Sequence, residues 1–207
     1  MRLLRGSAPA GFFSRCVAAR RQKCYDRGKN SERRRGGWGL RLYLQQGGGQ
    51  ENLFTVLDSC GCPLYELQGE YSSLGCRYKL CASGGGASLA RVTGVFLPTA
   101  FQYSVSAGER HMRLAIKPRA VHRPVQVKGV PWRFRGSIVT RCFDFVEDRD
   151  ERGKSRVVMT HGTCWNARGA CYAVEIFQGG DVPLALCAAV AVDMFLLGGS
   201  AVPVPAG

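Results

Sequence analysis

The residues best suited to binding chemistry form a basic segment, residues 110–143, which contains no Asp or Glu. In the run HMRLAIKPR, period-2 alternation places Arg113 and Lys117 on one face of a predicted strand, opposite apolar neighbours. Arg119 and Arg123 fall in the following loop. Lysine offers phosphate a point charge and arginine a bidentate fork. We therefore expect Arg113, Lys117, Arg119 and Arg123 to form a site for an anionic headgroup. The alternative is a solvated strand face whose charges aid solubility.

Residues with the chemistry of catalysis are few. His161 and Cys164 are close in sequence, but Cys/His catalysis also needs an imidazole oriented toward a low-pKa thiolate. Paired carboxylates occur only in EDRDE, residues 147–151, a charge run typical of an exposed hairpin loop. The sequence has no P-loop, no G-x-S-x-G and no H-E-x-x-H motif. We expect a non-enzymatic protein without a cofactor.

Ten cysteines raise the alternatives of disulfides or a zinc site. The nearest pairs, Cys60-Gly-Cys62 and Cys76-x4-Cys81, do not share the knuckle spacing of a structural zinc site. No apolar run near the N-terminus has the length of a secretory signal, which favours free thiols in a reducing compartment. We expect no metal site and most cysteines to behave as small buried hydrophobes.

The basic charge of the chain is concentrated near its N-terminus. Residues 1–38 contain 11 of the 29 Lys and Arg but only two of the 15 Asp and Glu, which is +9 of the net charge of +14. We expect this segment to be a disordered basic leader, with an organellar transit peptide as the alternative. A basic leader by itself gives only salt-dependent, sequence-blind binding to nucleic acid.

From Leu40 to Asp181 the chain consists of short alternating runs separated by glycine, proline and other turn residues. Examples are RLYLQQ, LFTVLD, PLYELQGEY, RYKLCAS, VQVKGVPW and SIVTRCFDFVED. No stretch in this region keeps a helical period for three turns. Such a pattern predicts an all-β fold, either a closed barrel or a sandwich.

The run VPLALCAAVAVDMFLLGG, residues 182–199, is the one helix candidate. Asp181 or Val182 caps it, Pro183 lies in its first turn, and two glycines end it. At about 22 Å it is short for a bilayer core, which needs about twenty apolar residues, and Asp193 adds a cost in lipid. A helix apolar on all sides must be buried. We favour a closed β-barrel filled by a helix over 182–197, with Asp193 emerging near one barrel mouth, over a membrane anchor.

Two phrases of the sequence resemble the LURP-one-related family of the Tubby-like C-terminal superfamily. They are FTVLDSCGCPLYELQGEYSSLGCRYKL and YAVEIFQGGDVPLALCAAVAVDMFLLG, and the resemblance extends over about residues 40–198. The motifs that carry it are Phe54-Thr55-Val56-Leu57-Asp58 with Gly61, Leu64-Tyr65-Glu66-Leu67 before Gly69, Trp132-x-Phe134-x-Gly136, and Ala191-Val192-Asp193. The glycine triplets at 47–49 and 84–86, the added cysteines and the leader depart from the family pattern.

The resemblance implies a mainly β fold, a closed antiparallel barrel of about twelve strands enclosing a hydrophobic C-terminal helix. The superfamily includes Tubby-like proteins, which bind phosphoinositides, and phospholipid scramblases. We therefore expect a binding or scaffold protein with anionic phospholipid as its ligand. The alternatives are a scramblase-like protein anchored by the C-terminal helix and a nucleic-acid-associated regulator.

The expected organisation is a leader over 1–38, a barrel domain over 39–198 and a flexible tail over 199–207. We expect a soluble monomer, cytoplasmic and membrane-peripheral, with organellar import through the leader as an open alternative. Protein partners are not indicated by the sequence, and no sequence-specific binding of nucleic acid is expected.

Overall fold

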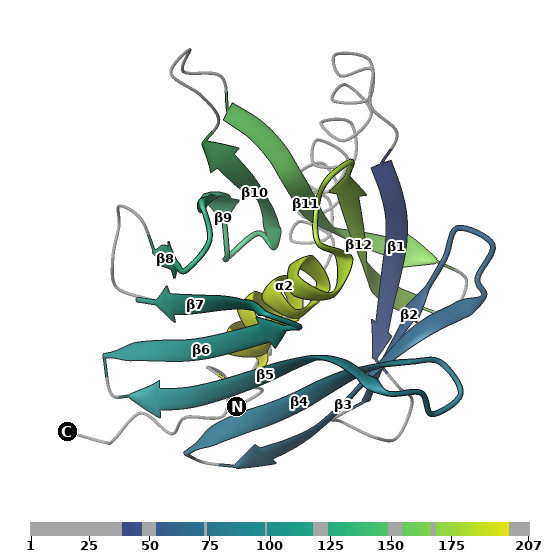
Figure 1. The fold of residues 1–207 in the computed structure, drawn as a ribbon, viewed down its shortest axis with the longest axis horizontal. Coiled ribbons are helices and arrows are strands. Elements are labelled where there is room, and N and C mark those ends of the chain that lie inside the picture. The colour runs from purple at the N-terminus through teal and green to yellow at the C-terminus, as the bar shows by residue number, and fades with distance from the viewer. Residues whose placement is uncertain are drawn as a thin grey trace, which may run out of the picture. The chain divides into compact units, whose positions relative to one another are not determined.

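The computed structural model describes residues 39–46, 53–72, 74–97, 99–117, 124–148, 155–166 and 169–198. Twelve antiparallel strands form one sheet that curls into a nearly closed barrel, and one C-terminal helix, α2, packs against its inner face (Figure 1). The fold class predicted from the sequence is confirmed. The predicted leader and tail lie outside the described residues.

The elements follow the alternating runs of the sequence. Their bounds are β1 Gly39–Gln46, β2 Leu53–Leu57, β3 Pro63–Ser72, β4 Gly75–Ala82, β5 Ser88–Leu97, β6 Ala100–Ala107, β7 Arg110–Ile116, β8 Val125–Lys128, β9 Trp132–Ser137, β10 Cys142–Asp148, β11 Ser155–Asn166, β12 Gly169–Phe177 and α2 Val182–Gly198.

Hydrogen-bonded neighbours follow the chain almost throughout. The sheet order runs from β8 back to β1, then from β12 back to β9, because β12 pairs with β1. The two ends of the sheet, β8 and β9, are consecutive in the chain but do not pair. The barrel therefore has one seam, at the turn between these two strands.

Two strand boundaries differ from the runs read in the sequence. The run VQVKGVPW is divided, since β8 ends at Lys128 and β9 begins at Trp132. Between them Gly129 has a φ of 89°, and a Cβ there would lie 2.5 Å from the carbonyl oxygen of His111. Only glycine fits that turn. The run SIVTRCFDFVED also begins late, with β10 starting at Cys142, because residues 138–141 form a turn.

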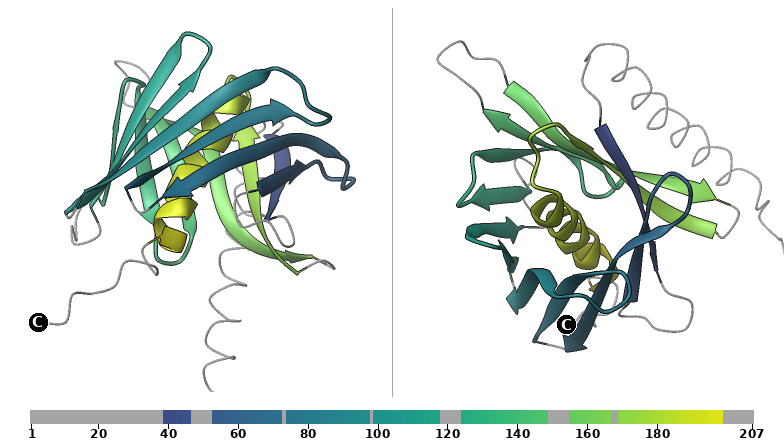
Figure 2. Two further views of the ribbon diagram at one scale, coloured as in Figure 1. Left: turned by 90° about the horizontal axis from the view of Figure 1, so that it is seen from below. Right: turned by 45° about the vertical axis from the view of Figure 1, so that its right-hand side comes forward.

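Helix α2 fills the interior of the barrel (Figure 2). Asp181 caps it, accepting a hydrogen bond of 2.9 Å from the Leu184 amide at its Oδ1. Every side chain from Leu184 to Phe195 is buried. The helix predicted over 182–197 is found at Val182–Gly198, and its burial is confirmed from Leu184 to Phe195. Among the described residues, no helix combines the length and apolar character needed to cross a bilayer.

The cysteine environments are more varied than expected. Cys76 and Cys187 are buried, and burial raises the pKa of their thiols to about 11 and about 12. Cys60 and Cys62, in the turn between β2 and β3, are exposed free thiols. Cys81 and Cys142 are half-buried. Of the six cysteines whose side chains the structure describes, only two are fully buried, so the prediction that most are buried is wrong for these six.

Candidate functional site: the basic outer face of the barrel

The predicted headgroup site is partly described. Met112, Leu114 and Ile116 of β7 point into the core, while Arg113 and Lys117 are exposed on the outside, so the predicted alternation is confirmed. Arg119 and Arg123 lie outside the described residues. Whether these four residues bind an anion stays a prediction.

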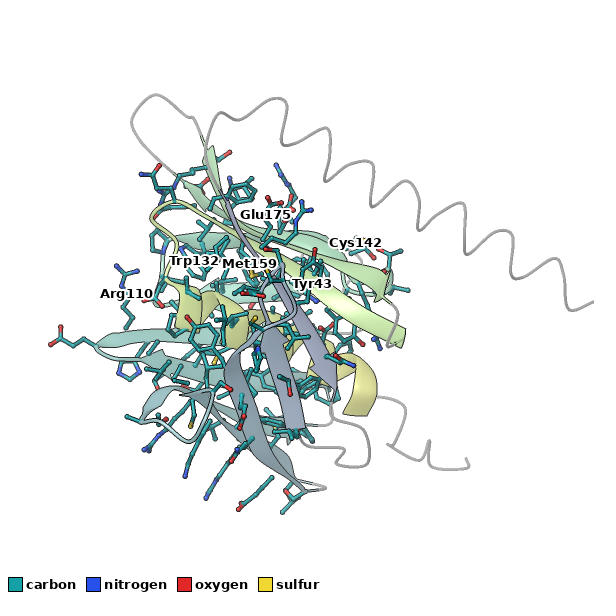
Figure 3. The ribbon with its side chains drawn as sticks, turned by 90° about the vertical axis from the view of Figure 1, so that its right-hand side faces the viewer. Tyr43, Arg110, Trp132, Cys142, Met159 and Glu175 are labelled. Carbon is teal, nitrogen blue, oxygen red and sulfur yellow. The ribbon has the colours of Figure 1, made fainter. Side chains whose placement is uncertain are left out.

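Several other arginines of the acid-free segment 110–143 have acidic partners from elsewhere in the chain. The Arg110 guanidinium lies 3.8 Å from Asp181, and Arg110 extends away from the barrel (Figure 3). Arg135 forms a 2.6 Å ion pair with Asp144 of β10. Arg133 pairs in the same way with a second β10 carboxylate. An acid-free stretch of sequence therefore does not make an acid-free surface.

The cations that remain lie on the outer face of β4 to β8, and the sheet register brings some directly opposite one another. Arg113 of β7 is the register partner of Lys128 of β8, and Lys79 of β4 is the partner of Arg91 of β5. All four side chains are exposed. Like charges directly opposite each other on a sheet are destabilising. Both pairs therefore destabilise the folded barrel, and both lie on the same outer face.

We define the basic face by its exposed cations, which are Arg77, Lys79, Arg91, Arg113, Lys117 and Lys128. Within the part of the chain that the structure describes, none of the six forms an ion pair within 4.0 Å. Two exposed acids adjoin the face. Glu70 of β3 is the register partner of Arg77, and Glu109 lies in the β6–β7 turn.

On β1 and on β9 to β12, the described arginines of the strands form ion pairs. Arg41 of β1 lies 3.6 Å from Glu175 of β12, and Arg156 of β11 forms a 2.5 Å ion pair with Glu147 of β10. With Arg135 and Arg133, the described arginines on these strands are neutralised by carboxylates. The positive charge of the barrel is thus concentrated on β4 to β8.

The interior holds a second chemical cluster, which the sequence did not predict. Asp193 of α2 is buried, and its Oδ2 lies 2.9 Å from the Nε2 of His161 on β11. The expectation that Asp193 emerges at a barrel mouth is wrong. A buried carboxylate needs a partner to offset its desolvation, and His161 supplies it inside the barrel. Strand alternation marks His161 as inward-facing, but no local pattern links it to a residue 32 positions away.

The hydrogen bonds of His161 determine where its protons lie. Its Nδ1 donates to the carbonyl oxygen of Arg141 at 3.0 Å, because a carbonyl can only accept. The contact between Nε2 and Asp193 must then contain one proton, shared between an imidazole and a carboxyl group. The pair carries no net charge, whether it consists of an imidazolium and a carboxylate or of a neutral imidazole and a protonated carboxyl group. Because both ring nitrogens are engaged, the imidazole has none left for general-base chemistry.

Aromatic rings and a strained turn hold this pair in place. The His161 ring stacks on Phe143 with centroids 4.4 Å apart, and on Tyr172 at 5.5 Å. Arg141, at a φ of 52°, contacts the Tyr172 hydroxyl and lies over its ring. Burial and the Asp193 charge raise the pKa of Tyr172, and Arg141 opposes this rise. The arrangement is that of a structural contact between helix and wall.

Comparison with known proteins adds little at the level of sequence. No family model matches the chain. No curated protein matches it either. Among solved structures, the chain is similar to an X-ray structure of a protein from Arabidopsis thaliana, at 13% sequence identity and a TM-score of 0.46. The match covers 78% of this chain and 93% of that chain.

Proposed function

We propose that this protein is a non-enzymatic binding protein whose ligand is the headgroup layer of anionic phospholipid. The observation that carries the proposal is the basic face. Its six cations have no acidic partner within ion-pair distance among the described residues, and two register pairs set like charges opposite each other. An anionic headgroup placed between Arg113 and Lys128, or between Lys79 and Arg91, would relieve that repulsion.

Membranes suit this face better than a small anion does. The six cations lie on or next to four strands, β4, β5, β7 and β8, and three strands separate β4 from β8, so a single phosphate cannot contact them all. A surface that carries many headgroups can. Each Lys or Arg near an anionic membrane contributes about 1 kcal/mol. The resemblance to the LURP-one-related family, whose superfamily includes phosphoinositide-binding proteins, supports the same ligand class.

A vesicle-binding titration tests the proposal. We expect the full chain to bind vesicles of phosphatidylcholine with phosphatidylserine or a phosphoinositide, and not vesicles of phosphatidylcholine alone. Binding should weaken steeply as salt rises from 50 to 500 mM, because salt screens exposed charges. Equal binding to neutral and anionic vesicles would contradict the proposal. A chain that binds RNA and no vesicle would favour the nucleic-acid alternative.

A further inference from the structure

Exposed aliphatic side chains gather at one end of the basic face. Leu74, in the β3–β4 turn, is 78% exposed, and Val95 and Leu97 near the end of β5 are 48% and 40% exposed. They are neighbours in space. The Phe96 amide, between the two β5 residues, donates a 3.1 Å hydrogen bond to the Leu74 carbonyl oxygen. Leu74, Val95 and Leu97 therefore form one patch, which we call the apolar end.

The sheet register connects the apolar end to the cations. Val95 heads a row of outer positions that runs through Gln102 of β6 and Ala115 of β7 to Gln126 of β8. The next row of outer positions lies two residues further from that end along each strand, about 7 Å from the first row. It runs from Arg77 through Thr93, Ser104 and Arg113 to Lys128.

Lys117 lies at the same end of the barrel as the patch. Phe101 is the register partner of Ile116, so Lys117 follows at the point where β6 begins with Ala100. Ala100 in turn is the register partner of Leu97. One strand thus separates the Lys117 backbone from that of Leu97, a separation of about 10 Å. Lys117 therefore lies near the apolar end at the same end of the barrel, and Arg77 and Arg113 lie in the row next to that of Val95.

We propose that the apolar end inserts into the interfacial region of an anionic bilayer, with Leu74, Val95 and Leu97 among the headgroups and upper acyl chains. This inference rests on the proposed function and adds to it the orientation of the barrel on the membrane. Apolar side chains bordered by cations are the combination by which peripheral proteins lie in a membrane interface. The charges draw the protein to the surface, and the aliphatic groups enter it.

Charge decides between a membrane and a second copy of this chain as the occupant. Two copies meeting at the apolar end would bring Lys117 and Arg113 of one protomer toward the same cations of the other, and like charges across an interface are costly. An anionic membrane satisfies both the aliphatic patch and the cations around it. The membrane is therefore the occupant that the structure favours.

Fluorescence quenching tests the insertion directly. The variant Leu74→Trp, made in the full chain, is mixed with vesicles of phosphatidylserine and phosphatidylcholine. The phosphatidylcholine carries bromine in the upper part of its acyl chains. Its emission, after subtraction of the parent signal, should be quenched. The matched control is Val139→Trp, since Val139 is 82% exposed but lies in the β9–β10 turn, outside the strands that carry the patch. Quenching of the control alone, or of neither variant on vesicles that retain the protein, would overturn the inference.

Binding measurements separate the inference from the proposed function. We expect Leu97→Ser to weaken binding to anionic vesicles by roughly tenfold, and Val139→Ser to leave it unchanged. If charge reversals on the basic face abolish binding and Leu97→Ser has no effect, the proposed function stands and the inference fails. If the parent binds no anionic vesicle, both fail. Sedimentation velocity completes the test, since a parent dimer dissociated by Leu97→Ser would show that the patch binds a second copy and overturn insertion.

Discussion

His161 Nε2 lies 2.9 Å from Asp193 Oδ2, and this buried contact joins the central helix α2 to the wall of the barrel at β11. The second oxygen of the carboxylate, Oδ1, has no hydrogen-bond partner among the described residues. Asp193 therefore depends on His161 for most of the compensation that a buried acid requires. The pair sets the position of α2 along the barrel, since an otherwise apolar helix has no other polar side chain to fix it.

We first predict the effect of breaking this pair. His161→Ala leaves a buried carboxyl group unpaired and should lower the free energy of unfolding by about 3–5 kcal/mol. Urea denaturation followed by circular dichroism measures this quantity. The control is the double variant His161→Leu with Asp193→Leu, which removes both polar groups and should cost less than His161→Ala. A cost below about 1 kcal/mol for His161→Ala would show that the pair contributes little.

A second prediction concerns pH and Cys187. Burial, and secondarily the charge of Asp181, raise the pKa of this thiol from 9.0 to about 12 in the folded protein. The folded state therefore retains its proton where the unfolded state has lost it, and the thiol's contribution to stability is full below pH 9 and falls as pH rises toward 12. Cys187→Ala should lose less stability over this interval than the parent. Parallel pH profiles of the unfolding free energy for the two proteins would contradict the prediction.

A third prediction concerns the start of α2. Asp181→Ala removes the acceptor of the Leu184 amide and should cost about 1 kcal/mol. Asp181→Asn keeps an acceptor at the same position and should cost only a few tenths. The Arg110 ion pair is lost in both variants, so it does not affect the comparison. Equal losses in thermal unfolding would mean that charge, and not the cap, is what Asp181 contributes.

The like-charge pairs lead to a fourth prediction. Lys128→Glu replaces the repulsion with Arg113 by an attraction and should raise the free energy of unfolding by about 0.2–1 kcal/mol. The same change should weaken binding to anionic vesicles. Lys128→Gln removes the repulsion without adding an attraction and should lie between the parent and Lys128→Glu in both measurements. Loss of stability in Lys128→Glu would show that the pair does not oppose folding.

Much of the fold follows from local rules that the sequence exposes. Alternation in HMRLAIKPR correctly separates the outward Arg113 from the inward Met112 and Leu114, because a strand has only two faces. The length, the cap and the almost entirely apolar composition of residues 182–197 correctly predict a helix, which is buried from Leu184 to Phe195. Local rules miss the turns at Gly129 and at residues 138–141, where tertiary packing divides runs that read as continuous.

The sites depend on contacts between distant residues, which a single sequence does not show. Arg110 pairs with Asp181 and Arg135 pairs with Asp144, and both acids lie outside the acid-free segment 110–143. Arg91 joins the basic face only through the sheet register. The pairing of His161 with Asp193 likewise needs the barrel to exist before the two meet. The sequence shows which residues are charged, but the sheet topology determines which of these charges have a partner.

The most direct test of the central claim is flotation of the full chain with vesicles containing phosphatidylserine or a phosphoinositide. We expect the parent to float with the vesicles and Arg113→Glu with Lys117→Glu to remain in the dense fraction, an affinity loss of about 30-fold or more. The matched control, Arg133→Glu with Arg135→Glu, changes the net charge equally at cations already paired with acids, and should float. Equal flotation of both double variants and the parent would contradict the account.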